Sequence, residues 1–244
     1  MATETKNYLT AVIFRIDFTD PVKVLPKTIE KVKTEIQDRL NEFHKGELET
    51  IAVEMGPEEQ KTIRKKSDFF DFTNNEKSER LRISQNNISF EVKEYKNYEY
   101  FRILIGDVLT EFNLKGNIKR LGLRYINELN IKEGSPFDWE GWVNATLIKS
   151  LEFYNTERLA RSMGVMNYIF DDFKLIFKYE MYNSEFPNPI SKKEFVLDFE
   201  CVTKEPCEID DPLDLLDKMH DFINEIFKES IGTEFERQRG KDLL

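Results

Sequence analysis

The amino-acid sequence predicts an α+β protein in which three long amphipathic helices pack on an extended antiparallel sheet. Several segments alternate apolar and polar residues with a period of two, as strands with one buried face do. Three other segments repeat apolar residues at steps of three and four, which is typical of a helix with one buried stripe. Runs of consecutive strands separate the helical segments, and this order favours antiparallel pairing with the helices on one face.

The composition fits a soluble, cytoplasmic protein. Of the 244 residues, 40% are hydrophobic and 34% are charged, as in globular proteins. The net charge of −10 argues against an extensive nucleic-acid surface or an anionic-membrane surface. No apolar run approaches the roughly 20 residues of a membrane span, and the first residues lack the pattern of a signal peptide. Two cysteines are too few for a disulfide framework and fit a reducing compartment.

The strands are predicted from alternation. Val12, Phe14 and Ile16 share one face of the first of them. The sharpest local signal is the pair Asn86-Asn87 between two alternating runs, because asparagine tolerates the left-handed backbone of a tight hairpin. The predicted strand segments are 8–18, 49–55, 62–72, 81–83, 88–92, 118–131, 158–170, 173–182 and 194–202.

The helices are predicted at 25–43, 98–112 and 213–227, with the first ending at Gly46. The acidic stretch 205–217 offers oxygen ligands for a divalent cation, but its spacing matches no calcium loop. Asp211 before Pro212 instead indicates the capped start of the third helix. We expect one unit over 1–244. Each half runs from strands to a helix, so a diverged duplication with halves 1–116 and 117–244 is a second reading.

The sequence offers little that indicates catalysis. No glycine-rich phosphate loop is present, and two histidines, His44 and His220, rule out a three-histidine zinc site. Cys201 alternates with core residues and is expected to be inert, while Cys207 has no recognisable zinc spacing. We therefore expect no cofactor and no metal, and favour a protein that is not an enzyme. The two tryptophans of the 135–142 loop are expected to pack on the sheet or to form a partner surface, and the tail 234–244 to be a solvated, fraying helix end.

The segment RLGLRYINEL is the most informative in the chain. On a strand, Arg120 and Arg124 share one face with Gly122 between them. Two forked guanidinium donors beside a bare glycine suit a phosphate or carboxylate. The opposite face, with Leu121, Leu123 and Tyr125, is expected to enter the core. The alternative is that both arginines pair with acidic neighbours and only hold the sheet together.

RLGLRYINEL also resembles the signature of a sporadically distributed bacterial and archaeal protein family of unknown function. The resemblance extends to LTAVIFRIDF near the start, to Tyr98, and to FVLDFECV with the helix around His220 that follows it. It implies a fold unit of about the full length of this chain. The positions that match the family motif are the predicted ligand-binding residues: Arg120, Gly122, Arg124, Tyr125 and Asn127.

These observations favour a non-catalytic binding module that recognises an anionic small molecule or a partner protein, which includes a second copy of itself. The scattered distribution of the resembling family suggests an accessory role, such as in a defence-type cassette. Two alternatives stay open. One is an enzyme acting on a phosphorylated small molecule, with Arg120 and Arg124 lining a concave pocket beside a carboxylate. The other is a structural subunit of a complex.

Overall fold

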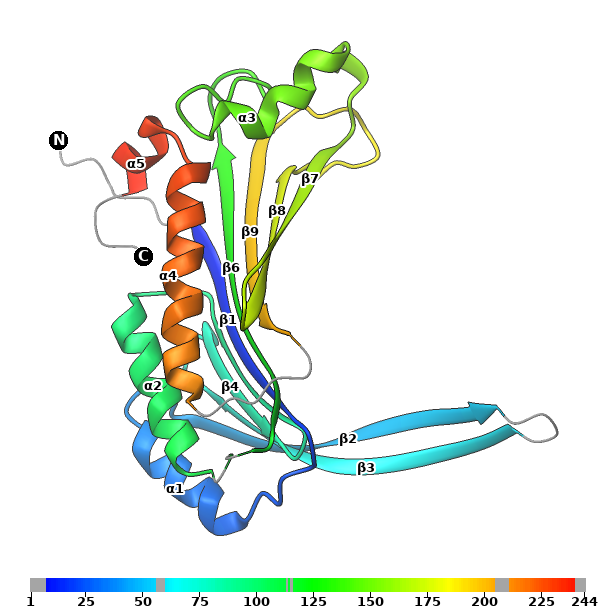
Figure 1. The fold of residues 1–244 in the computed structure, drawn as a ribbon, viewed down its shortest axis with the longest axis vertical. Helices are drawn as coiled ribbons and strands as arrows, with labels where there is room; N and C mark the ends of the chain where they lie inside the picture. Colours follow the sequence, from blue (N-terminus) through cyan, green and yellow to red (C-terminus); the bar gives the residue numbers. More distant parts are fainter. Residues whose placement is uncertain (1–7, 56–59, 113, 115, 205–210, 240–244) are drawn as a thin grey trace.

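The computed structural model describes residues 8–55, 60–112, 114, 116–204 and 211–239. Within these residues the chain forms one nine-stranded antiparallel sheet and five α-helices (Figure 1), so the predicted α+β class is confirmed. The strands are β1 Leu9–Phe18, β2 Glu42–Met55, β3 Gln60–Thr73, β4 Glu79–Ser84, β5 Asn87–Val92, β6 Ile118–Ile131, β7 Ser162–Ile169, β8 Phe173–Met181 and β9 Lys193–Thr203. The helices are α1 Pro26–Ile36, α2 Tyr98–Thr110, α3 Ala145–Ile148, α4 Pro212–Ser230 and α5 Thr233–Arg239, with 3₁₀ turns at Lys149–Phe153 and Thr156–Arg158.

The strand order across the sheet is β2-β3-β4-β5-β1-β6-β9-β8-β7. β1 and β6 lie side by side in the interior of the sheet and pair antiparallel, with Phe14 opposite Leu123 and Asp17 opposite Arg120. β6 pairs on its other side with β9, where Arg124 lies opposite Glu200. Segments about a hundred residues apart in the sequence therefore meet at this junction.

The helices α1, α2 and α4 cover one face of the sheet, and the sheet curves away from them (Figure 1). The strand side chains that point toward the helices are buried; Val12, Leu121 and Phe199 are 0% exposed. Burying an apolar side chain of this size contributes about 1.5–3 kcal/mol, so this layer supplies most of the fold's stability. The other face of the sheet carries no helix in the described part of the chain, and its polar side chains lie on a broad, concave surface.

The first predicted helix is wrong at its C-terminal end. α1 ends at Ile36 and the chain turns through Leu40, whose N–H donates to the Ile36 carbonyl at 2.8 Å. Phe43 and Gly46 belong to β2 and pair with Phe72 and Phe69. Leu40 is buried, so the apolar spacing of the sequence continues for four residues after the helix has ended. The predicted count also differs, because four helices of the described chain have seven or more residues rather than three.

The C-terminal tail is better anchored than the sequence indicates. Residues up to Arg239 form α5, and Phe235 is 0% exposed, with ring contacts to Tyr8 and Phe227. Residues 240–244 of the predicted fraying tail lie outside the described residues. Trp139 and Trp142 are 1% and 9% exposed, so both pack into the core as the first of their two readings predicts.

In the described part of the chain, no helix combines the length and the apolar character that crossing a membrane requires.

Candidate functional site

The uncovered face of the sheet carries a cluster of three arginines around Gly122. Arg120 and Arg124 are two residues to either side of Gly122 on β6, and Arg15 lies directly opposite it on β1. Asp17 of β1 accepts hydrogen bonds from Arg15 and Arg120, and Asp198 of β9 accepts from Arg124. We call these three arginines the arginine cluster. The expected pairing of both arginines with acidic neighbours is therefore observed.

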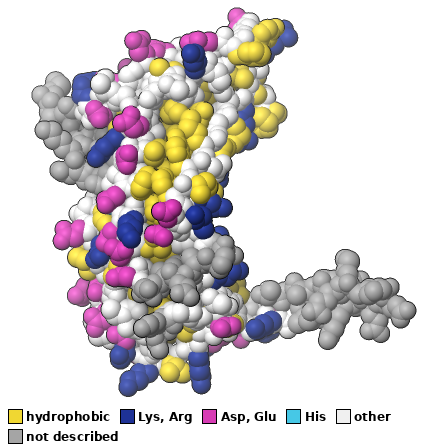
Figure 2. All heavy atoms as spheres, in the orientation of Figure 1, with side chains coloured by type: hydrophobic (Ala, Val, Ile, Leu, Met, Phe, Trp, Pro, Cys, Tyr) yellow, Lys and Arg dark blue, Asp and Glu magenta, His cyan; other side chains and the backbone are white. Residues whose placement is uncertain are grey.

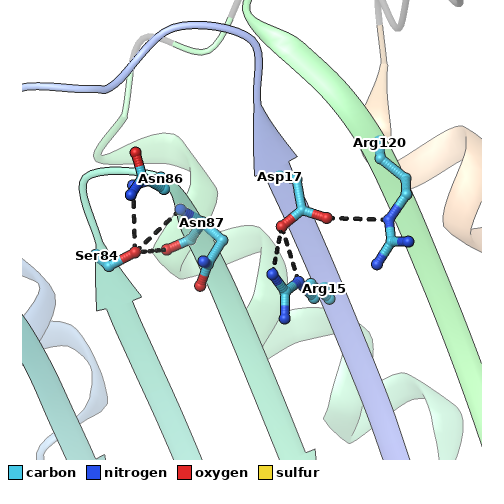
Figure 3. A network of polar contacts seen from close by, with 6 residues as sticks. All are labelled: Arg15, Asp17, Ser84, Asn86, Asn87 and Arg120. Carbon is cyan, nitrogen blue, oxygen red and sulfur yellow. Dashed lines mark hydrogen bonds and ion pairs between the residues drawn. The ribbon is translucent and has the colours of Figure 1, made fainter. Parts of the chain in front are cut away.

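Asp17 joins two arginines of the cluster (Figure 3). Its Oδ1 accepts from Arg15 Nε at 2.8 Å, and its Oδ2 accepts from Arg120 Nε at 3.0 Å. Register explains the geometry, since Asp17 and Arg120 are directly opposite in the β1–β6 ladder and Arg15 is two residues along the same face. Asp17 would still have Arg15 as its partner if the Arg120 side chain were removed.

Arg124 makes the more buried pair. Its Nε and Nη2 donate to the two carboxylate oxygens of Asp198, both at 2.7 Å, in a bidentate fork. The Asp198 side chain is 10% exposed and the Arg124 side chain 36%. The hydrogen bonds to Asp198 raise the pKa of Arg124 above its ordinary value, although burial acts in the opposite direction. The fork fixes the guanidinium on the surface while its outer edge faces solvent.

Gly122 can accept a side chain without strain. Replacing it therefore tests its predicted role in binding without disturbing the fold. A Cβ at this position would meet the Cys201 carbonyl oxygen at 3.5 Å, an ordinary contact. We expect Gly122→Ala to change the free energy of unfolding by less than about 1 kcal/mol, because a strand loses little when glycine becomes alanine.

Thermal unfolding of this variant beside Gly232→Ala provides the check. A Cβ at Gly232 would overlap the backbone carbonyl of Gly141, so this control should lose clearly more stability. Equal losses in the two variants would contradict the prediction.

On the helix-facing side of β6, Tyr125 is fully buried and bonded to α4. Its hydroxyl lies 2.8 Å from His220 Nδ1 and 3.4 Å from the Tyr95 hydroxyl, and His220 Nε2 lies 2.9 Å from Asn224 Nδ2. Leu121 and Leu123 are buried on the same face, as predicted. Burial raises the pKa of Tyr125 well above its ordinary value and raises that of Tyr95 to about 12. These hydroxyls therefore stay protonated.

His220 is enclosed by aromatic and acidic neighbours. The Tyr98 ring stacks on it with centroids 3.6 Å apart. The Tyr98 hydroxyl donates to Asp217 at 2.6 Å, and Arg102 forks onto the same carboxylate at 2.6 and 2.8 Å. Burial lowers the pKa of His220 to about 4, against the opposing pull of Asp221 and Asp217. The imidazole is therefore neutral at physiological pH and serves as a hydrogen-bonding core residue.

Asn127 lies on the same buried face of β6 as Tyr125 and is 3% exposed. Among the described residues, its Nδ2 has no hydrogen-bond partner, and neither has Oδ1 of Asn224 on α4. A buried donor without a partner costs about 1–3 kcal/mol. Of the five residues that match the predicted motif, three thus lie on the uncovered face and two in the interior.

Two hollows of the described surface lie away from the arginine cluster. One of about 720 Å³ lies among Arg39, Lys93, Tyr95 and Tyr100 at the start of α2, and one of about 390 Å³ among His44, Asp71, Arg80 and Lys93. Arg120 and Arg124 line neither hollow. The enzyme hypothesis requires a pocket beside Arg120 and Arg124, and neither of these two hollows is that pocket.

The remaining candidates have structural roles where they are described. Asp211 caps α4 by accepting from the N–H groups of Leu213 and Asp214 at 2.9 and 3.1 Å, as predicted. Cys201 is 0% exposed, and burial raises the pKa of its thiol. Cys207 and most of the acidic stretch before Asp211 lie outside the described residues. No group of three or more His, Cys, Asp and Glu side chains within the described ranges is arranged to hold a metal ion.

Sequence reasoning missed Arg15, Asp17 and Asp198 as members of the site. Arg15 and Asp17 alternate with core residues on the first predicted strand, so the sequence indicates that they lie on its exposed face. It does not indicate which strand pairs with this one. Only the β1–β6 and β6–β9 registers bring them to Gly122.

Comparison with protein-family models and with curated proteins finds no match for this chain. Membership of the family that RLGLRYINEL resembles stays a prediction.

Proposed function

We propose that this protein is a non-catalytic interaction module that binds an acidic segment of a partner protein on the uncovered face of its sheet. The observation that carries the proposal is the arginine cluster, three guanidinium groups gathered around a glycine and held in place by Asp17 and Asp198. Arginine is enriched at the energetic centres of protein interfaces, where its planar fork binds carboxylates.

Preorganisation supports this role. A free arginine side chain loses roughly 0.5–1.5 kcal/mol of conformational entropy when an interface immobilises it. Arg120 and Arg124 are already fixed by their aspartates, yet their side chains are 41% and 36% exposed. Binding at this surface would therefore cost little ordering.

The shape of the surface favours a macromolecule over a small molecule. Small-ligand sites are enclosed hollows that cover most of the ligand, whereas the uncovered face is broad and open along the whole sheet (Figure 1). The opposite side of the molecule displays many Asp and Glu side chains over the helices (Figure 2). An acidic partner would be repelled there and directed to the arginine face.

The strand order supports a second part of the proposal, a duplicated architecture. In the first half, β1 pairs with β5, the last strand before α2; in the second half, β6 pairs with β9, the last strand before α4. The two leading strands then pair with each other in an antiparallel arrangement. The arginine cluster lies across this seam, with Arg15 from one half and Arg120 from the other.

Titration with a synthetic glutamate-rich peptide tests the proposed function. We expect the peptide to shift the side-chain Nε–H resonances of the arginine cluster. Arg120→Ala should weaken the binding at least tenfold, or about 1.4 kcal/mol, because one of the three positive groups is lost. The fold should persist, since Arg15 still neutralises Asp17.

Arg102→Ala is the matched control. Arg102 is also forked onto an aspartate and is 39% exposed, but it lies on α2, on the covered side of the sheet. Its variant should bind the peptide like the unaltered protein. Equal weakening by the two variants would count against the proposal, as would unchanged arginine resonances at saturating peptide.

A further inference from the structure

One end of the sheet is an uncharged edge. β7 is the last strand in the order and pairs on one side with β8. Within the described residues, its backbone hydrogen bonds all lead to β8, so the N–H and C=O groups along its outer side are unpaired. Its eight residues, SMGVMNYI, include no lysine, arginine, aspartate or glutamate.

The opposite end of the sheet is protected in the usual way. β2 carries charged side chains along its length, among them Glu42, Lys45, Glu47 and Glu49. Charges on an edge strand discourage pairing with another chain, because pairing would bury them. The two edge strands of the sheet therefore differ in charge: β2 is protected against the addition of another strand, and β7 is not.

The exposed face of β7 is also largely apolar. Met163, Val165 and Ile169 are 53%, 50% and 65% exposed, and Asn167 is the fourth exposed residue on this face. Hydrophobic side chains line the upper margin of the molecule where β7 lies (Figure 2). An exposed apolar edge strand is a ready template for another strand.

The free edge has a defined beginning. Just before β7, the 183–190 loop covers the chain: Asn183 Nδ2 donates to the Ala160 carbonyl at 2.9 Å, and the Ile190 N–H donates to the Leu159 carbonyl at 2.8 Å. This cover stops at Ala160, and β7 begins at Ser162. The segment left open is therefore one strand long.

We propose that β7 pairs antiparallel with β7 of a second copy of this chain, about a two-fold axis at Met166. In this register Met163 lies opposite Ile169 of the other copy, and Val165 lies opposite Asn167 on the same face. Arg161, just before the strand, lies opposite Asp171, just after it. The Arg161 guanidinium is forked onto Glu180 of β8 at 2.7 and 3.1 Å within its own chain, so Asp171 of the other copy would add a second acidic partner to it at both ends.

The neighbouring registers that keep the same faces together fit less well. Centring on Val165 places Arg161 opposite Ile169, and centring on Asn167 places Asp171 opposite Met163. Each sets a charged side chain against an apolar one. The charges that flank β7 therefore select the Met166 register and identify a second copy as the complementary partner.

Sedimentation velocity over a hundredfold range of protein concentration tests the proposal. The unaltered protein should form a dimer, and Val165→Lys should raise the dissociation constant at least tenfold, because it places a charge in the middle of the paired edge. The control is Leu48→Lys, which charges a side chain of similar exposure, 41%, on the edge strand β2. This variant should dimerise like the unaltered protein.

Circular dichroism verifies that each variant is folded, and Ile169→Lys replaces Val165→Lys if that variant is not. The register is tested by Met166→Cys in a Cys207→Ser background with a short thiol crosslinker, which should join two copies covalently, whereas Leu48→Cys should not be joined. An unaltered protein that stays monomeric at every concentration would overturn the proposal. A dimer that forms equally well in the folded β7 variant, Val165→Lys or its replacement Ile169→Lys, would overturn it as well.

Discussion

Replacing Gly232 with alanine is expected to lower the free energy of unfolding by about 3 kcal/mol, the upper part of the range for inserting a methyl group where no space exists. A Cβ at this position would overlap the carbonyl group of Gly141. The obstacle is backbone on both sides, so no side-chain rotation relieves it.

Hydrogen bonds hold both glycines in place. The Gly232 N–H donates to the Trp142 carbonyl at 2.9 Å, and the Gly141 carbonyl accepts from the Glu234 N–H at 2.8 Å. Gly141 has a φ of 73°, a left-handed conformation that other residues rarely adopt. Moving the backbone at Gly141 or Gly232 would disturb the buried Trp142, which follows Gly141 in the sequence.

Urea unfolding of Gly232→Ala measures the effect, with Gly122→Ala as the control because its Cβ has room. The expected result is a clearly lower midpoint for Gly232→Ala with an unchanged slope. Two coincident curves would show that the backbone contact between the tryptophan loop and the residues after α4 adjusts more easily than its hydrogen bonds suggest.

The second large expected effect is a loss of stability with acid that comes from His220. The pKa of this residue is lowered from 6.5 to about 4 by burial. The unfolded chain therefore takes up a proton first as the pH falls, and folding loses stability between about pH 6.5 and pH 4. A pKa difference of this size corresponds to about 3 kcal/mol of unfolding free energy. The folded protein has all of this stability above pH 6.5 and has lost it below pH 4.

Comparison with His220→Gln isolates this contribution. The variant keeps a polar side chain but cannot titrate, so the difference in unfolding free energy between the two proteins should shrink as the pH falls from 7 to 4. Asp217 has a lowered pKa because its bonds to Arg102 and Tyr98 outweigh its burial, and its loss of charge falls below pH 4. A difference that stays constant from pH 7 to pH 4 would show that His220 takes up a proton in the folded protein as readily as in the unfolded chain, and would contradict the prediction.

Period-two alternation and helical spacing are local properties, and they located most of the fold. The predicted hairpin is present as β4 and β5, but its turn is Gln85-Asn86 and Asn87 already belongs to β5. Neither asparagine has the left-handed φ on which the prediction rested. The strand 118–131 is β6 with its predicted buried and exposed faces. The error at the end of α1 has a physical cause: Leu40 is buried by tertiary packing, and its spacing from Ile36 equals one helical turn. Tertiary contacts of this kind leave no local signal.

The candidate site was half accessible to sequence reasoning for the same reason. Arg120, Gly122 and Arg124 share a face because a strand alternates, and alternation can be read from the sequence. Arg15 and Asp198 reach them through pairing with other strands. Pairing depends on which strands become neighbours, so these partners were not predictable from one sequence.

The pairing of β1 with β6 also determines when this chain can finish folding. β1 is synthesised before the strands that it pairs with, and its pairing with β5 and packing under α1 and α2 involve residues up to Thr110. Its other edge waits for Ile118–Ile131, and β6 in turn waits for β9. Until then the chain emerging from the ribosome presents an open strand edge in the middle of its future sheet. Non-local pairing of this kind slows folding and prolongs exposure to aggregation. Completion of the fold therefore depends on the last strand rather than the first.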